Sequence, residues 1–191
     1  MSTAIKLAAT VMIVLLSGCV AVPQGQVPLQ DRLAIEGKIR ELVETATVAM
    51  RVGTPSALDR AQAALEVARD INPDEARVVD GLGCVEWRRG NHRLAEKFFK
   101  QALELNPDYD RAFAHLAMVA EADGDRNAAR TLLQTAVKMN PLNYRSRNNY
   151  AALLLEDGQT KAAYQQLLRA VQSGGGSEAE IKANLVNVRE D

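Results

Sequence analysis

Few side chains in this sequence could carry covalent or acid–base chemistry: the cysteines Cys19 and Cys84 and the histidines His92 and His115. Cys84 lies in an apolar stretch with helical spacing, which favours a small buried side chain over a nucleophile. His92 lies in a predicted turn and is interpreted as a solvated polar residue. His115 lies on a predicted helix, and we expect it to pack at the edge of the core rather than to act in catalysis.

Other signatures of enzyme or metal chemistry are missing from the sequence. The spacing of the two histidines relative to carboxylates is not that of a metal site. The chain also lacks a glycine-rich phosphate loop and a Ser–His–Asp pattern with the expected strand or helix context. The sequence therefore predicts a protein that is not an enzyme, with no metal, no small-molecule substrate and no cofactor other than a covalent lipid described below.

The amino-acid composition further limits the class of protein to which this chain could belong. The chain has 191 residues, with 23 Lys+Arg against 24 Asp+Glu and no cluster of basic residues, so we expect no nucleic-acid partner. Aromatic residues make up only 4% of the chain, whereas alanine and leucine are abundant. Small apolar side chains of this kind favour packed helices over β-structure. Two cysteines cannot form a disulfide framework if one of them is modified.

The first cysteine ends an apolar segment. Residues 7–16, LAATVMIVLL, follow Lys6 and precede Ser17-Gly18-Cys19. A helix needs about 20 apolar residues to span a bilayer, so this run is short for that purpose but suits the core of a signal peptide. An uncleaved anchor and an ordinary signal peptide are the alternatives to the lipoprotein interpretation that follows.

The segment Leu16-Ser17-Gly18-Cys19 resembles the lipobox of bacterial lipoproteins. The resemblance implies a signal peptide over residues 1–18, cleavage between Gly18 and Cys19, and diacylglyceryl and N-acyl groups on Cys19. Several acyl chains anchor a protein stably, whereas one does so only reversibly. Residue 20 is valine rather than aspartate, which in the lipoproteins of diderm bacteria favours the periplasmic face of the outer membrane. Residues 19–30, which carry no charge, are expected to form a lipidated tether.

The rest of the sequence repeats every 34 residues. Pro73, Pro107 and Pro141 each follow an asparagine at this interval. Repetition at such a period indicates stacked supersecondary units. Three further columns keep the same step over four copies: Ala61, Ala95, Ala129 and Ala163; Leu65, Phe99, Leu133 and Leu167; Ala68, Ala102, Ala136 and Ala170.

These columns resemble the tetratricopeptide repeat, and residues 76–109 match it best, with Val79, Leu82-Gly83, Ala95, Phe99, Ala102 and Pro107. The resemblance implies an all-α solenoid of about four helix–turn–helix repeats. A repeat array needs capping segments, because its terminal repeats otherwise expose an apolar face. The expected boundaries are an N-terminal cap over 31–41 that extends the first helix of the first repeat backwards, repeats over 42–75, 76–109, 110–143 and 144–177, and a C-terminal capping helix over 178–191.

Turn residues agree with these repeats. Gly90, Gly124 and Gly158 recur at the end of each first helix, where the left-handed conformation suits glycine. Thr54 and Pro55 have the types expected at an N-cap and at the first helical position. Ser177 with Glu180 resembles a capping box that opens the last helix, after the glycine-rich break 173–177.

One column marks a candidate binding face. Arg77, Arg111 and Arg145 lie 34 residues apart in the first turn of successive first helices, and in the tetratricopeptide family this position lines the concave groove. The negative charges of Asp74 and Glu75 are expected to offset the positive charge of Arg77. No acid accompanies Arg145, so we expect it to form an uncompensated polar cluster at the groove or its rim with Arg147, Asn148 and Asn149.

The cluster has two interpretations. It could capture a carboxylate or backbone of a partner, as in carboxylate-clamp proteins, although Ala46 and Ala114 stand where that clamp has Lys or Asn. Alternatively, it is a solvated face paired with acids of a neighbouring repeat. Trp87 is expected to pack on the next helix, or else to form a binding anchor. His115, on the same set of helices, is also a groove candidate.

The combination of lipid anchor, tether and repeats resembles the lipoproteins that assemble type IV pili, where they act as secretin pilotins, and Flp/Tad pili. Residues 148–170 are similar to a repeat of the pilotin group. The resemblance implies an outer-membrane scaffold that binds protein partners such as a secretin or pilus assembly proteins. The alternative is an adaptor that docks peptidoglycan hydrolases or other envelope enzymes.

Overall fold

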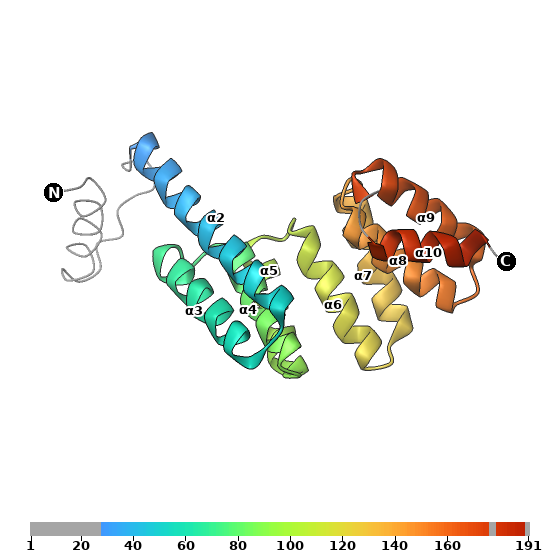
Figure 1. Cartoon of the computed structure of the whole chain (residues 1–191), viewed down its shortest axis with the longest axis horizontal. Coiled ribbons are helices and arrows are strands. Elements are labelled where there is room, and N and C mark those ends of the chain that lie inside the picture. The colour runs from blue at the N-terminus through green and yellow to red at the C-terminus, as the bar shows by residue number, and fades with distance from the viewer. Residues whose placement is uncertain (1–27, 176–178, 190–191) are drawn as a thin grey trace. The chain divides into compact units, whose positions relative to one another are not determined.

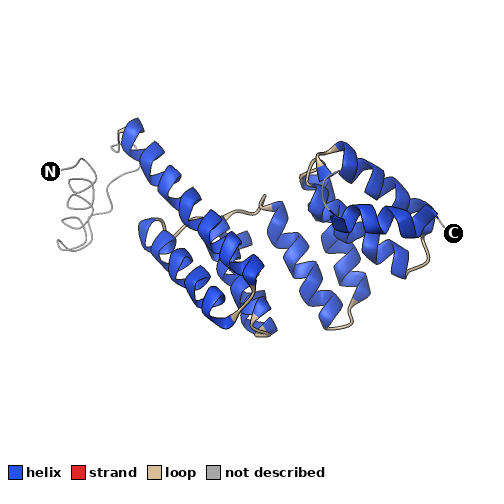
Figure 2. Ribbon diagram, viewed as in Figure 1, coloured by secondary structure: helices blue, strands red, loops and turns tan. Residues whose placement is uncertain are grey.

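A computed structural model describes residues 28–175 and 179–189 of the chain. The expected signal peptide, most of the tether and the expected capping box at Ser177 lie outside these ranges. All regular structure within them is helical (Figure 2), which confirms the all-α prediction. The helices are α2 (Leu29–Val52), α3 (Pro55–Ile71), α4 (Ala76–Arg88), α5 (His92–Leu105), α6 (Asp110–Ala122), α7 (Arg126–Met139), α8 (Tyr144–Glu156), α9 (Thr160–Gln172) and α10 (Ala179–Arg189).

Successive helices pair as antiparallel hairpins (Figure 1). The closest pairs are α4 with α5, α6 with α7 and α8 with α9, and each hairpin packs on the next through α5 against α6 and α7 against α8. The helix α10 packs on α9 and α8. From α3 onward, helices adjacent in sequence are therefore adjacent in space, as in an array of repeats.

Local chemistry sets the ends of these helices. Gly90, Gly124 and Gly158 have φ of 82°, 80° and 71°, which confirms the left-handed turns expected from the sequence. The helices α3, α5 and α7 each end two residues before the repeated prolines. Thr54 caps α3 by accepting a hydrogen bond from the backbone N–H of Ala57 at 3.3 Å, with Pro55 as the first helical residue.

The repeated columns form the core between the helices. Every residue of the three columns is at most 2% exposed, and Phe99 has the largest side chain among them. The alanines on α3, α5, α7 and α9 permit close approach, because they place no bulk between the helices. The register that the sequence predicts from the period of 34 is thus the register in which the side chains are buried.

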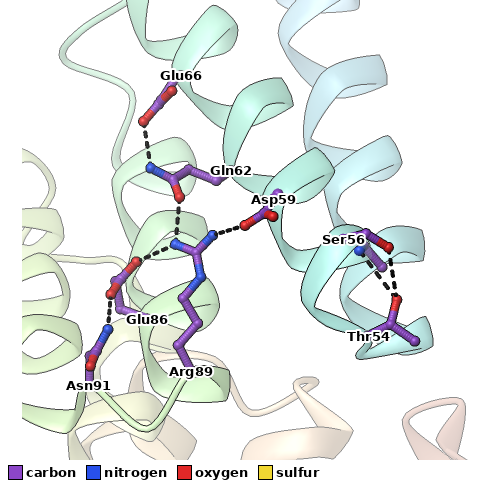
Figure 3. A network of polar contacts seen from close by, with 9 residues as sticks. Thr54, Ser56, Asp59, Gln62, Glu66, Glu86, Arg89 and Asn91 are labelled. Carbon is purple, nitrogen blue, oxygen red and sulfur yellow. Dashed lines mark hydrogen bonds and ion pairs between the residues drawn. The ribbon is translucent and has the colours of Figure 1, made fainter.

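Polar side chains also join neighbouring hairpins. Arg89, just after α4, donates to Asp59 and Gln62 of α3 and to Glu86 of α4, and Asn91 donates to Glu86 at 2.7 Å (Figure 3). A second set joins α7 to the end of α8. There Arg126 and Arg130 donate to the carboxylate of Asp157, and Arg126 also pairs with Glu156.

The two ends of the described chain differ in detail from the expected boundaries. The helix α2 begins at Leu29, inside the expected tether, and continues without interruption to Val52. The carbonyl of Pro28 accepts hydrogen bonds from the N–H groups of Asp31 and Arg32 at 3.0 and 3.1 Å, so Leu29 and Gln30 belong to the helix rather than to the tether. At the other end, α10 begins at Ala179, and its Ile181 is 2% exposed because this helix packs on α9 and α8.

None of the described helices has the length and apolar character that crossing a bilayer requires.

Candidate partner-binding groove

The first helices of successive hairpins line one groove with a volume of about 880 Å³. Most of its lining comes from α2, α4, α6 and α8, with single residues from α5 and α10. All residues that line the groove lie between Thr47 and Ile181 in the sequence. Among the predicted site residues, the lining includes Trp87, Arg111, His115, Arg145, Asn148 and Asn149.

Trp87 and Asn148 are held firmly in this wall. Trp87 packs against the buried cluster around Phe99, and its ring stacks on His92 with the ring centroids 4.2 Å apart. His92 is therefore exposed but not merely solvated. Asn148 is 3% exposed, and its Oδ1 accepts a hydrogen bond from Nδ2 of Asn184 on α10 at 3.0 Å.

Arg147 does not reach the groove, so its expected place in an uncompensated cluster with Arg145 is wrong. Its side chain is buried, and its Nε donates to the carbonyl of Pro141 while a terminal nitrogen donates to Gln166 of α9, both at 2.7 Å. Residues two apart on a helix do not share a face, which explains why Arg145 and Arg147 diverge. Burial and the charge of Arg169 lower the pKa of Arg147.

Arg77 also lies outside the groove lining. Its Nε pairs with the carboxylate of Glu75 at 2.8 Å, as the nearby acids in the sequence suggested. The equal spacing of Arg77, Arg111 and Arg145 thus does not give three equivalent groove positions.

The groove is basic. Its described lining contains four arginines, one from each of α2, α4, α6 and α8, and no aspartate or glutamate. They are Arg51, Arg88, Arg111 and Arg145. The guanidinium of Arg145 lies 5.1 Å from the centre of the Tyr144 ring, a cation–π contact. A surface lined by cations of one sign attracts a segment of opposite charge.

One polar atom in the groove wall has no partner within the described ranges. Ser146 is 1% exposed and lines the groove, yet its Oγ makes no hydrogen bond there. An unpaired buried hydroxyl costs free energy, about 1–3 kcal/mol. A ligand that donates to or accepts from this hydroxyl would recover part of that cost.

The structure brings together three side chains that the sequence analysis kept apart. Asp80 and Cys84 of α4 meet His115 of α6, with one ligand-type atom of each within 4.8 Å of the others. Nδ1 of His115 lies 2.6 Å from Oδ1 of Asp80, and the hydroxyl of Tyr109 donates to Oδ2 of Asp80 at 3.3 Å. Asp80 is 1% exposed, so these partners satisfy a carboxylate that is shielded from water.

Charge in this cluster favours a protonated histidine. Burial by itself lowers the pKa of His115, but the charges of Cys84 and Asp80, with their hydrogen bonds, outweigh it and raise the pKa to about 10. Burial, and next the charge of Asp80, raise the pKa of Tyr109, so its phenol remains neutral. The cluster is therefore best described as an imidazolium held between a carboxylate and a sulfur atom.

The same distances argue against a preformed metal site. Two ligands of one zinc ion are separated by about 3.3 Å or more, since each lies about 2.0–2.3 Å from the metal. The Nδ1–Oδ1 distance of 2.6 Å is that of a hydrogen bond instead. The sulfur of Cys84 lies 3.7 and 3.8 Å from the two ring nitrogens, which are hydrogen-bond distances to sulfur.

A sequence signal for this cluster existed. Asp80 and Cys84 are four residues apart and so lie on one face of their helix. His115 follows Asp80 by 35 residues, one more than the repeat period, which places it at nearly the same position on the next first helix. A search for metal-like spacing within one segment misses groups that come together through the repeat.

Comparisons with known proteins agree with the fold. A family model described as tetratricopeptide repeat matches residues 54–110 and 115–178, more than half of the chain, and a second with the same description matches 86–136. No curated protein matches the chain.

Solved structures of several other proteins have similar folds. The structure from a study titled "Functional Characterization of Pseudomonas Aeruginosa pilF" has a TM-score of 0.64 at 14% identity, over 81% of this chain and 69% of that one. The first TPR domain of Spaghetti (RPAP3), solved with the HSP90 peptide SRMEEVD, has a TM-score of 0.55 at 14% identity, over 61% and 91%.

The O-GlcNAc transferase of Thermobaculum terrenum is similar over 72% of this chain with a TM-score of 0.58 and 22% identity, but this chain covers only 26% of that longer protein. These likenesses concern the fold alone. The family matches, the period of 34 and the succession of helical hairpins lead to one conclusion: the chain belongs to the tetratricopeptide repeat family.

Proposed function

We propose that this protein is a lipid-anchored scaffold whose basic groove binds an acidic segment of a protein partner. Tetratricopeptide proteins generally mediate protein–protein interaction. The observation that carries the finer proposal is the groove lining, with arginines from four successive first helices and no described acid. Such a groove suits an extended or helical segment that carries several carboxylates.

Charge reversal in the groove tests this binding mode. We expect Arg111→Glu with Arg145→Glu to weaken binding of a fluorescent peptide of alternating glutamate and leucine about tenfold or more, because each lost attraction is also replaced by a repulsion. Fluorescence anisotropy at low and high salt measures the affinity. The matched control is Arg60→Glu with Arg69→Glu on α3, exposed arginines outside the groove lining. Equal affinity of both double variants would refute the groove as the binding site.

We further propose that Cys19 carries the lipid and that the protein resides at the periplasmic face of the outer membrane. The support is the lipobox resemblance of Leu16-Ser17-Gly18-Cys19 and the valine at position 20. Cys19→Ala should abolish incorporation of radiolabelled palmitate, since no other acceptor is expected, whereas Cys84→Ala should retain the label. A palmitate signal in the Cys19 variant would show that the anchor assignment is incorrect.

The cellular role that we favour is assembly of an envelope complex, most simply a type IV or Flp/Tad pilus or a related secretion system. Its support is the resemblance of residues 148–170 to a pilotin repeat, combined with the expected anchor. Deletion of the gene should reduce the heat-resistant secretin multimers in outer membranes, and the wild-type chain should restore them. Normal secretin multimers together with mislocalised peptidoglycan hydrolases would support the adaptor role instead.

A further inference from the structure

Three sulfur-containing side chains form a row across the groove. Met50, Cys84 and Met118 lie 34 residues apart, at the same repeat position of α2, α4 and α6, and all three line the groove. We call them the sulfur row. Methionine is flexible and polarisable, and a free cysteine behaves as a small apolar group, so such a row suits apolar side chains of a ligand. Equal spacing of the row indicates equal spacing in what it binds.

Helix packing sets the distance between neighbouring members of this row. The helix α4 packs on α6, and α6 packs on α8. Packed helices lie about 8–10 Å apart. In a polyproline-II chain every third side chain returns to the same face after about 9.3 Å, which matches this distance. The same-face repeat is about 6.8 Å in a β-strand, which is too short, and every seventh side chain of an α-helix repeats after about 10.5 Å.

Polar groups beside the row favour the extended chain over the helix. Thr47, His115 and Asn149 share one repeat position on α2, α6 and α8, one helical turn before that of the sulfur row, and all three line the groove. The buried hydroxyl of Ser146 in the same wall has no partner within the described ranges. A helical ligand satisfies its own backbone, whereas an extended chain brings N–H and C=O groups that need partners. Asparagine and serine side chains can both donate and accept.

Arginines lie on both sides of the sulfur row. Arg88 lies one helical turn after Cys84 on α4, and Arg111 lies two turns before Met118 on α6; both line the groove. The described lining contains no carboxylate group. Residues of a ligand that lie between its apolar side chains are therefore favoured as acids.

We propose that the groove binds an extended acidic segment that carries an apolar side chain at every third residue. Three such side chains lie on Met50, Cys84 and Met118, one for each first helix. The acids between them pair with the arginines, and the backbone of the segment pairs with the polar side chains of the wall. This inference rests on the acidic partner proposed above and adds the conformation and the register of its bound segment.

Two fluorescent peptides of identical composition test this register on the full-length chain. LEPLEPLEP has a leucine at every third residue, and LEPELPEPL has one at every fourth; proline favours the extended conformation in both. We expect the first to bind about tenfold more tightly in fluorescence anisotropy, because only one leucine of the second can lie on the row at a time. This comparison requires no protein variant.

The possible results separate this inference from the proposed function. Equal affinities of the two peptides would overturn the register. If both affinities then still fell in Arg111→Glu with Arg145→Glu, the acidic groove would remain. Tighter binding of a helical peptide rich in alanine and glutamate, with leucines seven residues apart, would show that a helix occupies the groove and would also overturn the register. If no peptide bound, both proposals would be refuted.

Met118→Gln tests the row itself. Glutamine has a similar length, but its amide gains no partner in a leucine side chain. Affinity for LEPLEPLEP should fall about fourfold, and the preference over LEPELPEPL should shrink with it. Met139→Gln on α7 is the matched control, because Met139 is an exposed methionine outside the groove lining, and it should keep the wild-type affinity. With circular dichroism showing that both variants are folded, an unchanged preference in Met118→Gln would overturn the proposal.

Discussion

Replacing Asp80 by alanine is expected to lower the free energy of unfolding by about 3 kcal/mol. The carboxylate is 1% exposed and is the hydrogen-bond partner of both His115 and Tyr109. Its removal leaves a charged ring and a phenol without their shared acceptor, and breaking one side of a buried pair typically costs about 3–5 kcal/mol. We take the lower figure because the His115 side chain remains 20% exposed and regains some hydration. Urea denaturation followed by circular dichroism measures the loss.

Asp80→Asn serves as the comparison, since its amide oxygen can still accept a hydrogen bond without the charge. We expect it to lose clearly less than Asp80→Ala. Equal losses in the two variants would mean that the negative charge of Asp80 accounts for the whole effect, and that a neutral hydrogen-bond acceptor of the same shape contributes little.

The same cluster gives the protein a defined pH dependence. The pKa of His115 is raised to about 10 in the folded state, against about 6.5 in an unfolded chain. A group with a raised folded pKa contributes stability that is fully present below the unfolded value and is lost as pH rises through the folded value. The melting temperature should therefore fall between pH 7 and pH 10 in the wild type, and this slope should be weaker in His115→Gln.

Phe99→Ala is expected to cost about 3–5 kcal/mol, the usual range for removing a buried aromatic ring. Phe99 is 2% exposed and packs with Leu116 and Val119 of the next hairpin as well as with its own. The cavity left by the missing ring would thus weaken the packing of α5 against α6 of the next hairpin, as well as the packing within its own hairpin. Thermal and urea denaturation measure the loss of stability.

The ring of Phe99 also explains why a glycine follows Leu82. A Cβ built on Gly83 would lie 2.5 Å from Cε1 of Phe99, closer than any tolerated contact. Gly83→Ala should therefore cost about 1–3 kcal/mol through overpacking, despite the higher helix propensity of alanine. When Phe99→Ala is already present, the added methyl group should cost nothing or restore stability, a coupling that a double-mutant cycle reports.

Gly37→Ala on α2 is the internal control for this cycle. A Cβ built on Gly37 meets no atom within 4 Å. The variant should be neutral or slightly stabilising, because alanine has the higher helix propensity. Strict additivity of Gly83→Ala and Phe99→Ala would contradict the contact between these two residues.

The fold could largely be predicted from the sequence because each repeat contains its own helix, turn and core signals. The prolines, the glycines at φ near 80° and the buried columns recur with the same period. An ambiguous prediction in one repeat can therefore be settled by the equivalent positions in the other repeats. The start of α2 was misplaced for the opposite reason. Residues 28–30 have no counterpart in another repeat, and the hydrogen bonds from the Pro28 carbonyl were not visible in an uncharged Pro- and Gln-containing segment.

The groove was only partly predictable. Arg111 and Arg145 could be assigned by their position in the repeat, but the same position did not place Arg77 in the lining. Arg147 could not be assigned, because its side chain contacts Pro141 and Gln166. The Asp80–His115 pair joins two repeats, and a periodic pattern describes what successive copies share rather than how they touch. Contacts between unlike residues of neighbouring repeats need coordinates.

The order in which hairpins contact one another has a mechanical consequence. Helices pack mainly on those next to them along the chain, and Arg89 and Arg126 fasten particular boundaries. A pull on the two ends would load these boundaries in series, so hairpins should detach one by one at modest force instead of rupturing together.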